Sequence, residues 1–323
     1  MRFFLLDVRM IALSRYNHDI YAFDSGCFRP MCAAVHLIVE QGRVAFVETA
    51  HNGSLPRALE ALQQLGLGPE CVDWVIVTHV HLDHAGGAGA YLQAFPHARL
   101  VVHPRGARHM ADPSKLWAGT VAVYGEAVAR GMYGQLLAIP QERIVEGSHE
   151  KVIDLAGRQL ICLDTPGHAR HHLCLLDSRS GCLFTGDVFG LSYRELDVDG
   201  RPSIIPTTTP VQFEPEEMRR SIDLILSYQP AALYLTHFSE VREVPRLGAD
   251  LHRLLDGYLA LAEQVSGAGE ARYSLLLDGL YALMDAEAQR QGWRLSPAAL
   301  RQLLRLDLEL NAQGLVVWLD SRS

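Results

Sequence analysis

The chain has 323 residues, of which 49% are hydrophobic and 20% charged, and its formal net charge is −8. This composition excludes a disordered chain, and the length suffices for one large or two smaller domains with a sizeable core. The acidic balance, with no strongly basic run, argues against nucleic acid as a partner, because that affinity depends on Lys and Arg at phosphates.

Neither the N-terminus nor the cysteines indicate an exported protein. Residues 1–10 form a short apolar patch broken by Asp7 and Arg9, too short and too charged for the core of a signal peptide. No run approaches the ~20 apolar residues of a membrane helix. The six cysteines form no CxxC pair, so we expect buried free thiols. We therefore expect a soluble cytoplasmic protein without membrane contact.

The first predicted elements alternate between strands and helices. Their order is a β-hairpin, an amphipathic helix, a buried strand, a helix and a strand, over residues 35–39 with 44–48, 55–65, 72–78, 89–94 and 100–103. This alternation predicts an α/β core. Residues 104–141 then interrupt it with two helix-like pieces, several glycines and aromatic residues, and this insertion is suited to capping a pocket.

The second half begins with a predicted meander of short strands, at residues 144–145, 151–155, 159–164, 173–177 and 182–185. Two prolines exclude regular structure at 206–210. A helix over 215–227 and a last strand over 232–236 follow. From about Pro245 the pattern is helical, with a leucine stripe, a second helix over 275–288 and a third that opens at Ser296-Pro297 and ends near Asn311. We expect this tail to be a packing or dimerising appendage.

The densest chemical cluster directly follows the buried strand. The segment Thr78-His79-Val80-His81-Leu82-Asp83-His84-Ala85-Gly86-Gly87 holds four potential metal ligands within six residues. Strand ends are where α/β folds build their sites, and imidazole with carboxylate suits zinc and related ions. In an extended segment His79 and His81 project to the same side, and the turn can bring Asp83 and His84 to a second ion.

This segment resembles the HxHxDH signature of the metallo-β-lactamase superfamily. Three further motifs occur in the order which that family requires: Asp164-Thr165-Pro166-Gly167-His168, Phe184-Thr185-Gly186-Asp187 and Tyr234-Leu235-Thr236-His237. The resemblance covers about residues 30–240. It implies a four-layer αββα sandwich, with a catalytic domain over residues 1–244 and a helical C-terminal extension over 245–323.

The resemblance also implies which residues hold metal. One ion would take His79, His81 and His168, the second would take Asp83, His84 and His237, and Asp187 would bridge both. We expect two divalent ions, zinc as the first choice, with iron and manganese as alternatives because mixed N/O ligands do not discriminate sharply. A water shared by two dications loses a proton near neutral pH, and the hydroxide attacks an electrophilic centre.

Three other positions are weighed for roles beside the metals. Asp83 can orient the nucleophile and pass its proton to the leaving group. His172 follows His168 by four residues and either bonds a ligand or substrate or is simply buried. The neighbouring His171 is expected to be exposed. The family's Asp-Thr-Gly turn is replaced here by Glu48-Thr49-Ala50, which puts the support of the ligands in doubt.

The leading functional interpretation is hydrolysis of a small-molecule ester, thioester or lactone. Tyr193 is a candidate to stabilise the oxyanion, with Tyr124 and Tyr133 as rivals. A redox diiron relative would typically carry glutamate where His81 stands, which favours hydrolysis. Two alternatives stay open: a phosphodiesterase acting on a small phosphodiester, and a metal-containing ligand-binding or regulatory protein with little turnover. The helical tail also leaves a homodimer open.

Overall fold

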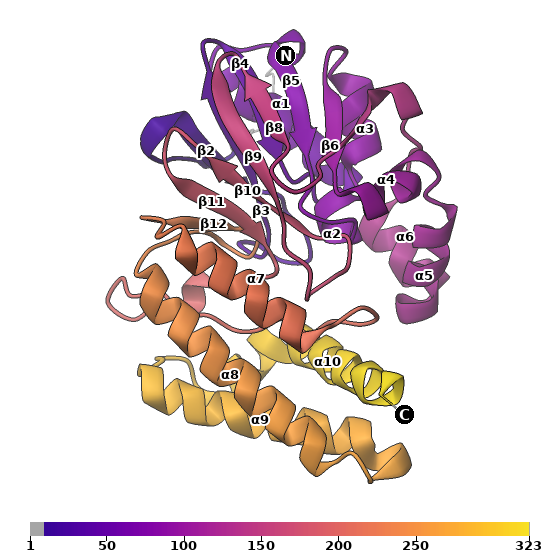
Figure 1. Cartoon of the computed structure of the whole chain (residues 1–323), viewed down its shortest axis with the longest axis vertical. Coiled ribbons are helices and arrows are strands. Elements are labelled where there is room, and N and C mark those ends of the chain that lie inside the picture. The colour runs from indigo at the N-terminus through magenta and orange to yellow at the C-terminus, as the bar shows by residue number, and fades with distance from the viewer. Residues whose placement is uncertain (1–9, 323) are drawn as a thin grey trace, which may run out of the picture.

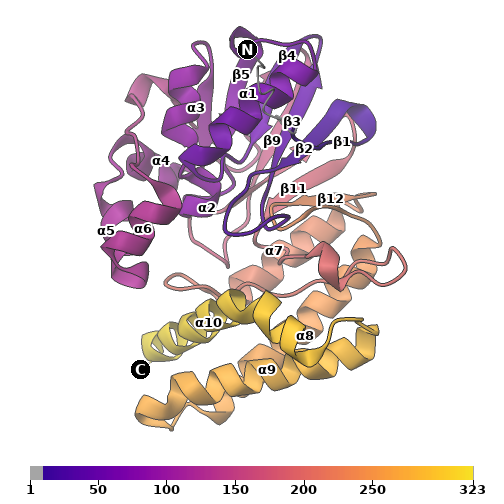
Figure 2. The ribbon, with the colours of Figure 1, turned by 180° about the vertical axis from the view of Figure 1, so that it is seen from behind.

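The computed structural model describes residues 10–322, so the expectation for the N-terminal patch lies almost wholly outside the described residues. Two β-sheets lie face to face, and helices cover the outer side of each (Figures 1 and 2). This is the four-layer αββα sandwich that the family resemblance implied. Within the described residues, no helix is long and apolar enough to cross a membrane.

The first sheet has seven strands in chain order. They are β1 (Leu13–Arg15), β2 (Ile20–Asp24), β3 (Ala34–Glu40), β4 (Arg43–Val47), β5 (Val72–Ile76), β6 (Arg99–Val102) and β7 (Ile144–Glu146). From β1 to β4 neighbours are antiparallel, and from β4 to β7 they are parallel. The predicted hairpin is the β3–β4 pair, with Ile38 opposite Ala45.

The second sheet has six strands in the order β13-β12-β11-β10-β9-β8. They are β8 (Val152–Leu155), β9 (Arg158–Asp164), β10 (Leu173–Asp177), β11 (Cys182–Gly186), β12 (Leu233–Leu235) and β13 (Ser239–Val241). The predicted meander is the antiparallel run from β8 to β11, whereas β12 joins β11 in parallel after a helical crossover.

Helices form the two outer layers and also gather at one end of the sandwich. In chain order they are α1 (Leu55–Gln64), α2 (Leu82–Ala85), α3 (Ala88–Ala94), α4 (Pro104–Ala111), α5 (Ser114–Tyr124), α6 (Glu126–Tyr133), α7 (Pro215–Ser227), α8 (Val244–Gln264), α9 (Arg272–Gln291) and α10 (Pro297–Ser321). Single-turn 3-10 helices lie at Asn17–Asp19, Asn52–Ser54, Pro69–Cys71, Gln141–Arg143, Arg194–Leu196 and Gly269–Ala271.

Three hydrophobic cores fill the spaces between the four layers. Adjacent residues of one strand enter different cores: Phe46 faces α1 and α3, and Val47 faces the second sheet. The same alternation occurs at Val75 and Ile76. Both faces of the sheet are therefore buried, which explains why these strands are continuous apolar runs.

Three details differ from the sequence-based prediction. Residues 144–145 belong to β7 and pair in parallel with β6, not with the meander, because both partners lie in the first sheet. The strand predicted to be last is followed by β13. The insertion at residues 104–141 holds three helices, not two.

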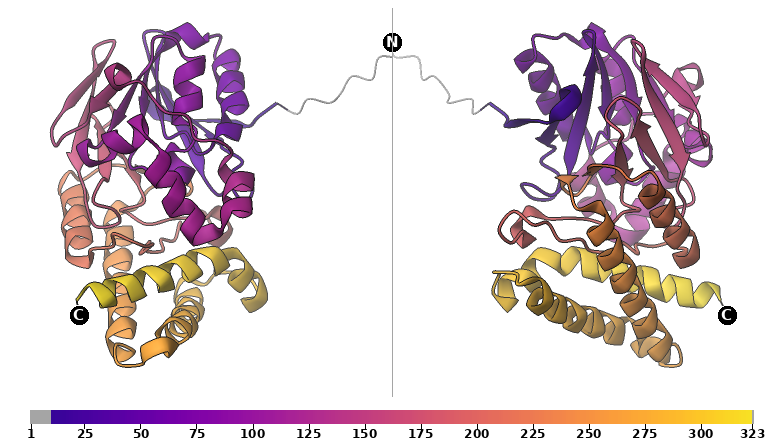
Figure 3. Two further views of the ribbon diagram at one scale, coloured as in Figure 1. Left: turned by 90° about the vertical axis from the view of Figure 1, so that its right-hand side faces the viewer. Right: turned by 60° about the vertical axis from the view of Figure 1, so that its left-hand side comes forward.

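The C-terminal helices pack as part of the molecule. The stripe on α8 is buried against the second sheet and α7, with Leu247, Leu251 and Tyr258 each 0% exposed. Leu304 and Leu308 of α10 enter the same core. The helix α10 begins at Pro297, where the Ser296 side chain accepts a hydrogen bond from Ala299 N–H, but it runs ten residues beyond the predicted end. Residues before and after position 244 therefore share one hydrophobic core. Figure 3 shows the three C-terminal helices gathered at one end of the sandwich.

Candidate metal centre

The HxHxDH segment sits where β5 ends. Val77 N–H still donates to the Val101 carbonyl of the neighbouring strand, so the chain stays extended as far as the histidines. His81 then occupies the N-cap of α2 with extended backbone angles. The following turn is tight: a Cβ on Gly86 would lie 2.4 Å from the Leu82 carbonyl oxygen, and one on Gly87 would lie 2.9 Å from backbone oxygens. Only glycine allows this close approach.

The first cluster consists of three histidine nitrogens. His81 Nδ1 lies 2.9 Å from His79 Nε2 and 3.1 Å from His168 Nε2. These are the three residues that the resemblance assigned to one ion, and their ligating atoms fall within 4.8 Å of one another. Residues 89 positions apart along the chain therefore converge on one point.

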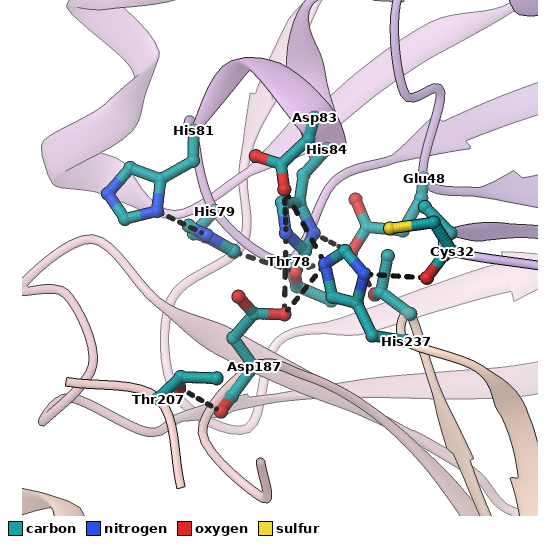
Figure 4. Close-up of polar contacts among 12 residues, drawn as sticks. Cys32, Glu48, Thr78, His79, His81, Asp83, His84, Asp187, Thr207 and His237 are labelled. Atoms are coloured by element: carbon teal, nitrogen blue, oxygen red, sulfur yellow. Dashed lines mark hydrogen bonds and ion pairs between the residues drawn. The ribbon is translucent and has the colours of Figure 1, made fainter. Parts of the chain in front are cut away.

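The second cluster combines one carboxylate with two imidazoles. Asp83 Oδ2 lies 3.7 Å from His84 Nε2 and 3.5 Å from His237 Nε2. These three residues are the predicted ligands of the second ion, and their ligating atoms also lie within 4.8 Å of one another. The motif at the end of β12 thus meets the motif that follows β5, although the two come from different sheets (Figure 4).

Asp187 lies between the two clusters. Its Oδ1 is 3.3 Å from His84 Nε2 and 3.7 Å from His237 Nε2, whereas its Oδ2 is 3.6 Å from His168 Nε2. One carboxylate therefore faces members of both clusters, which is the arrangement expected of a bridging ligand.

Hydrogen bonds fix the orientation of two of the histidine rings, His237 and His168. His237 Nδ1 lies 2.8 Å from the Cys32 carbonyl oxygen and must donate to it, which leaves the Nε2 lone pair directed at the cluster. The Thr207 hydroxyl donates to the Asp187 carbonyl, so it accepts from His168 Nδ1 at 3.0 Å. These bonds select the tautomer that a metal ligand requires.

Glu48 provides the same kind of support despite the departure from the family's turn. The Glu48 side chain is 1% exposed, and its Oε1 accepts hydrogen bonds from the Thr78 and Thr236 hydroxyls. The Thr78 oxygen in turn lies 3.1 Å from His79 Nδ1 and accepts its proton. Glu48 Oε1 is also 3.3 Å from His84 Nδ1. The longer side chain thus reaches both metal-bearing motifs.

The two clusters differ in their electrostatics. Burial lowers the pKa of His81 to about 3 and that of His168 to about 4, so the first cluster is neutral near pH 7. Burial would also lower the pKa of His84, but the carboxylates of Asp187, Asp83 and Glu48 outweigh it and raise that pKa to about 10. A metal entering the second cluster must therefore displace a proton.

Several polar atoms of the two clusters have no hydrogen-bond partner in the described part of the protein, as expected of metal ligands. Among residues 10–322, both ring nitrogens of His84 and Asp187 Oδ1 are buried without a hydrogen-bond partner. Buried polar atoms are rarely left so, because each costs about 1–3 kcal/mol. Imidazole and carboxylate are the ligands of zinc and related divalent ions. The donor set therefore fits two divalent cations.

The cluster forms the floor of a cavity of about 490 Å³. Asp83, Asp187 and His237 line its floor. Its walls come from the loop before β3, from α5 and from α10. A volume of this size is in the range that takes small organic ligands.

His172 is placed as a positioning residue. It is 0% exposed, its Nε2 accepts from Asp187 N–H at 3.3 Å and its Nδ1 lies 3.0 Å from the Thr165 hydroxyl. Both ring nitrogens face protein groups, and burial holds its pKa well below the ordinary value. Its ring nitrogens thus contact Asp187 and Thr165, and among the described residues His172 does not line the cavity, which is the geometry expected of a positioning residue.

The prediction that His171 is exposed is wrong. Only 8% of His171 is exposed, it lines the cavity, and its ring lies edge-on to that of His81 at 5.7 Å between centroids. The turn between β9 and β10 carries it inward together with His168, which the sequence spacing alone did not reveal.

Tyr193, Tyr124 and Tyr133 all line the cavity. The Tyr193 hydroxyl donates to Asp307 at 3.1 Å, and the Arg29 guanidinium lies 4.2 Å from its ring centroid. An oxyanion contact from Tyr193 would require that hydrogen bond to break, so its catalytic role stays a prediction.

Sequence reasoning missed the contribution of α10. Asn311 accepts from Thr208 N–H at 2.6 Å and donates to the Pro206 carbonyl at 3.0 Å, and thereby holds the segment that carries Thr207. A Cβ on Gly314 would lie 1.5 Å from the Thr208 carbonyl oxygen, so the helix and this segment touch backbone to backbone. In the sequence, the one sign of this contact is a polar residue, Asn311, within the apolar pattern of the helix.

Comparisons with known proteins agree with this geometry. The family model of the metallo-beta-lactamase superfamily matches residues 33–237. The chain is 26% identical over 206 residues to the uncharacterized protein YobT of Bacillus subtilis, which covers 62% of this chain and 81% of that protein.

Two further similar proteins are named as a hydrolase and a thioesterase. Hydroxyacylglutathione hydrolase of a Synechococcus strain is 34% identical over 40% of this chain and 38% of its own length. Human acyl-coenzyme A thioesterase MBLAC2 is 31% identical over 35% of this chain and 40% of its own length. The chain thus matches less than half of each.

Solved structures extend the likeness to the C-terminal helices. The archaeal superfamily protein ST1585 from Sulfolobus tokodaii has a TM-score of 0.64 at 22% identity and covers 93% of this chain and 98% of its own. TTHA1429 from Thermus thermophilus has a TM-score of 0.68 at 18% identity and covers 94% of each chain. Such coverage exceeds what residues 1–244 alone supply, so the fold with its helical tail is shared. By motif, fold and family model alike, this chain belongs to the metallo-β-lactamase superfamily.

Proposed function

We propose that this chain is a two-metal hydrolase of small acyl thioesters, within the wider class of esters, thioesters and lactones. The observation that carries the proposal is the convergence of His79, His81, Asp83, His84, His168, Asp187 and His237 on the floor of a cavity large enough for a small molecule. Open coordination positions toward a cavity distinguish a catalytic from a structural metal site.

The relatives favour a thioester among these substrates. Two similar proteins are named for hydrolysing thioesters of glutathione and coenzyme A, both polar thiols. The matches cover only part of each protein, so the substrate class is the proposal and not a transferred fact. Zinc is the proposed metal, with iron and manganese as alternatives.

Two bound dications would supply an activated water and polarise the carbonyl oxygen of the substrate. Asp83 lines the cavity and faces His237, so it can hold the attacking oxygen in line with the acyl carbon. As the new C–O bond forms and the C–S bond breaks, the sulfur leaves as thiolate. Asp83 passes it the proton from the attacking oxygen, so water is added across the bond.

The identity of residue 81 favours hydrolysis over a redox function. A diiron redox relative would typically carry glutamate at this position, whereas His81 here lies within 3.1 Å of its two partner nitrogens. An all-imidazole first cluster supports hydrolytic chemistry.

The test begins with protein purified from zinc-supplemented medium, its metal content measured by elemental analysis. We expect about two ions per chain and hydrolysis of S-lactoylglutathione or short acyl-coenzyme A, with lactones, p-nitrophenyl esters and bis-p-nitrophenyl phosphate compared. His81→Ala should lower kcat/KM by about 10³-fold or more, because several kcal/mol of transition-state stabilisation depend on the metals. His97→Ala, at an exposed histidine outside the cavity, is the control.

Full metal content without turnover of any substrate would overturn the proposal in favour of a regulatory protein. Fast cleavage of the phosphodiester alone would replace the thioester with the phosphodiesterase alternative.

A further inference from the structure

The helix α5 is apolar, yet among its side chains only that of Leu116 packs against one of the three cores in the described structure. Its sequence Ser-Lys-Leu-Trp-Ala-Gly-Thr-Val-Ala-Val-Tyr has no buried residue in the described structure. An apolar helix normally buries its stripe against the protein. In Figures 1 and 2, α5 and α6 project from the sandwich at the end that also carries α10.

The apolar stripe of α5 faces the cavity instead. The residues that line it recur at helical spacing, and they are Leu116, Gly119, Thr120, Val123 and Tyr124. Spacings of three and four residues place these side chains on one face of the helix. Val123 is nevertheless 46% exposed. Apart from the packing of Leu116 against a core and the contact of Tyr124 with Tyr133, this face therefore meets the cavity.

A second stripe on α10 lines the same cavity. Leu303, Leu306 and Leu310 face it, whereas Leu304 and Leu308 on the other side of the helix are 0% exposed in the core. From Leu303 to Leu310 the stripe extends about 10 Å along the helix axis. The helix α10 thus has one face in the core and one toward the cavity, and Leu303 at their border contacts both.

The cavity is continuous from the metal ligands to these stripes. Asp83 and His237 line it at one side, and the exposed cations Lys115 and Arg305, one on each helix, line it as well. A molecule whose reacting bond lies at the ligands must extend the rest of its length past the leucines. Its apolar part would cover the stripes, and covering apolar surface is favourable by about 25 cal/mol per Å².

We infer that the stripes of α5 and α10 hold the straight apolar acyl chain of the substrate. The inference rests on the proposed function, because a polar thiol as leaving group makes the acyl part the apolar one. The specificity-determining residues are Leu116 and Val123 on α5 and Leu303, Leu306 and Leu310 on α10. The substrate class becomes thioesters of unbranched acids longer than those of the smallest metabolites.

The test uses straight-chain acyl thioesters of N-acetylcysteamine with increasing chain length on the metal-loaded protein. Each added methylene that enters the cavity should raise kcat/KM about fourfold, up to the length at which the chain fills it. A second series lengthens an alkanethiol leaving group on a fixed acetyl group. A gain in the second series and not in the first would overturn the assignment to the acyl side.

Binding gives a readout that does not depend on turnover. The matching thioethers, in which CH₂ replaces the carbonyl, are titrated calorimetrically into the metal-loaded protein, and affinity should also rise about fourfold per methylene. If no thioester is cleaved but thioether affinity rises with length, the proposed function fails and the chain site stands. If thioesters are cleaved with no dependence on length in either assay, the chain site fails alone.

A matched pair of variants locates the effect. Val123→Asp places a charge in the wall, and the preference for octanoyl over acetyl thioester should fall about tenfold or more. Val128→Asp on α6 is the control, because Val128 is 52% exposed and is not among the described residues that line the cavity. Equal effects of the two changes, or none from Val123→Asp, would contradict the inference. Both positions are exposed, so both variants should fold.

Discussion

The floor and the walls of the cavity differ in burial and in hydrogen bonding. Most floor residues lie at or just after strand ends, are buried, and have ring nitrogens fixed by hydrogen bonds such as that from His237 to Cys32. The walls come from the loop before β3 and from faces of α5 and α10, with Val123 of α5 about half exposed. The contrast teaches that reaction type and substrate choice have separate structural sources here: the rigid floor fixes the chemistry, and the walls select what enters.

Among three substitutions outside the metal ligands, the largest effect is expected at Asn311, which joins a wall of the cavity to its floor. Asn311→Ala removes the partners of Thr208 N–H and the Pro206 carbonyl, both buried. We expect a loss of about 3 kcal/mol in the free energy of unfolding, because two buried polar groups are left unpaired. Urea denaturation measures this loss. A simultaneous fall in activity would show that α10 holds Thr207 in place, and full stability would contradict the coupling.

An intermediate effect is expected within the floor itself. Glu48→Gln keeps the size of the side chain but removes the charge that faces His84 at 3.3 Å. We expect metal affinity, measured by competition with a chelator, to fall about 10- to 100-fold. The matched control is Glu287→Gln, at another buried glutamate, which pairs with Arg253 far from the cavity. That change should lower stability and leave metal affinity as it was; equal losses of affinity in both would refute the role of Glu48.

The smallest expected effect is on the pH dependence of stability, and it comes from His36, a buried histidine outside the proposed ligand set. His36 is 1% exposed, contacts Ser239 at 3.2 Å, and burial lowers its pKa to about 3. The folded protein keeps His36 neutral, whereas the unfolded chain protonates it below pH 6.5. The free energy of unfolding is therefore highest above pH 6.5 with respect to this residue, and it decreases as the pH falls from 6.5 toward 3. At pH 5.5 this loss is about 1.4 kcal/mol.

His36→Phe should remove that part of the acid sensitivity. Because the other buried histidines are the same in both proteins, the difference between their unfolding free energies should change by about 1.4 kcal/mol from pH 7.5 to pH 5.5. Chemical denaturation of metal-free protein at both pH values measures it. A difference that does not vary with pH would show that His36 is protonated in the folded state.

The floor could be predicted from the sequence, whereas the walls could not. Four ligands within six residues after a strand carry their own chemical signal, and Asp187 and His237 each end an apolar run. The strands were found for a similar reason, since both of their faces are buried. The sequence did not reveal that β7 belongs to the first sheet, because a short apolar run does not specify its partner strand.

The walls depend on contacts between segments that are distant in the sequence. The leucines of α10 form one continuous apolar pattern, and nothing local separates Leu304, which enters the core, from Leu303, which faces the cavity. His171 was misjudged for the same reason: its burial is set by how the β9–β10 turn lies against α4, which no local pattern encodes.

The absence of buried residues in α5, as the described structure has it, has a consequence for how this protein can change. Most substitutions in a folded chain are limited by stability, but this helix has no fully buried side chain among the described residues, and only Leu116 packs against a core. Its inward positions can therefore accumulate new side chains without a matching repair elsewhere. Divergence between relatives, or selection in the laboratory, should find new substrates first in these eleven residues while the ligands stay as they are.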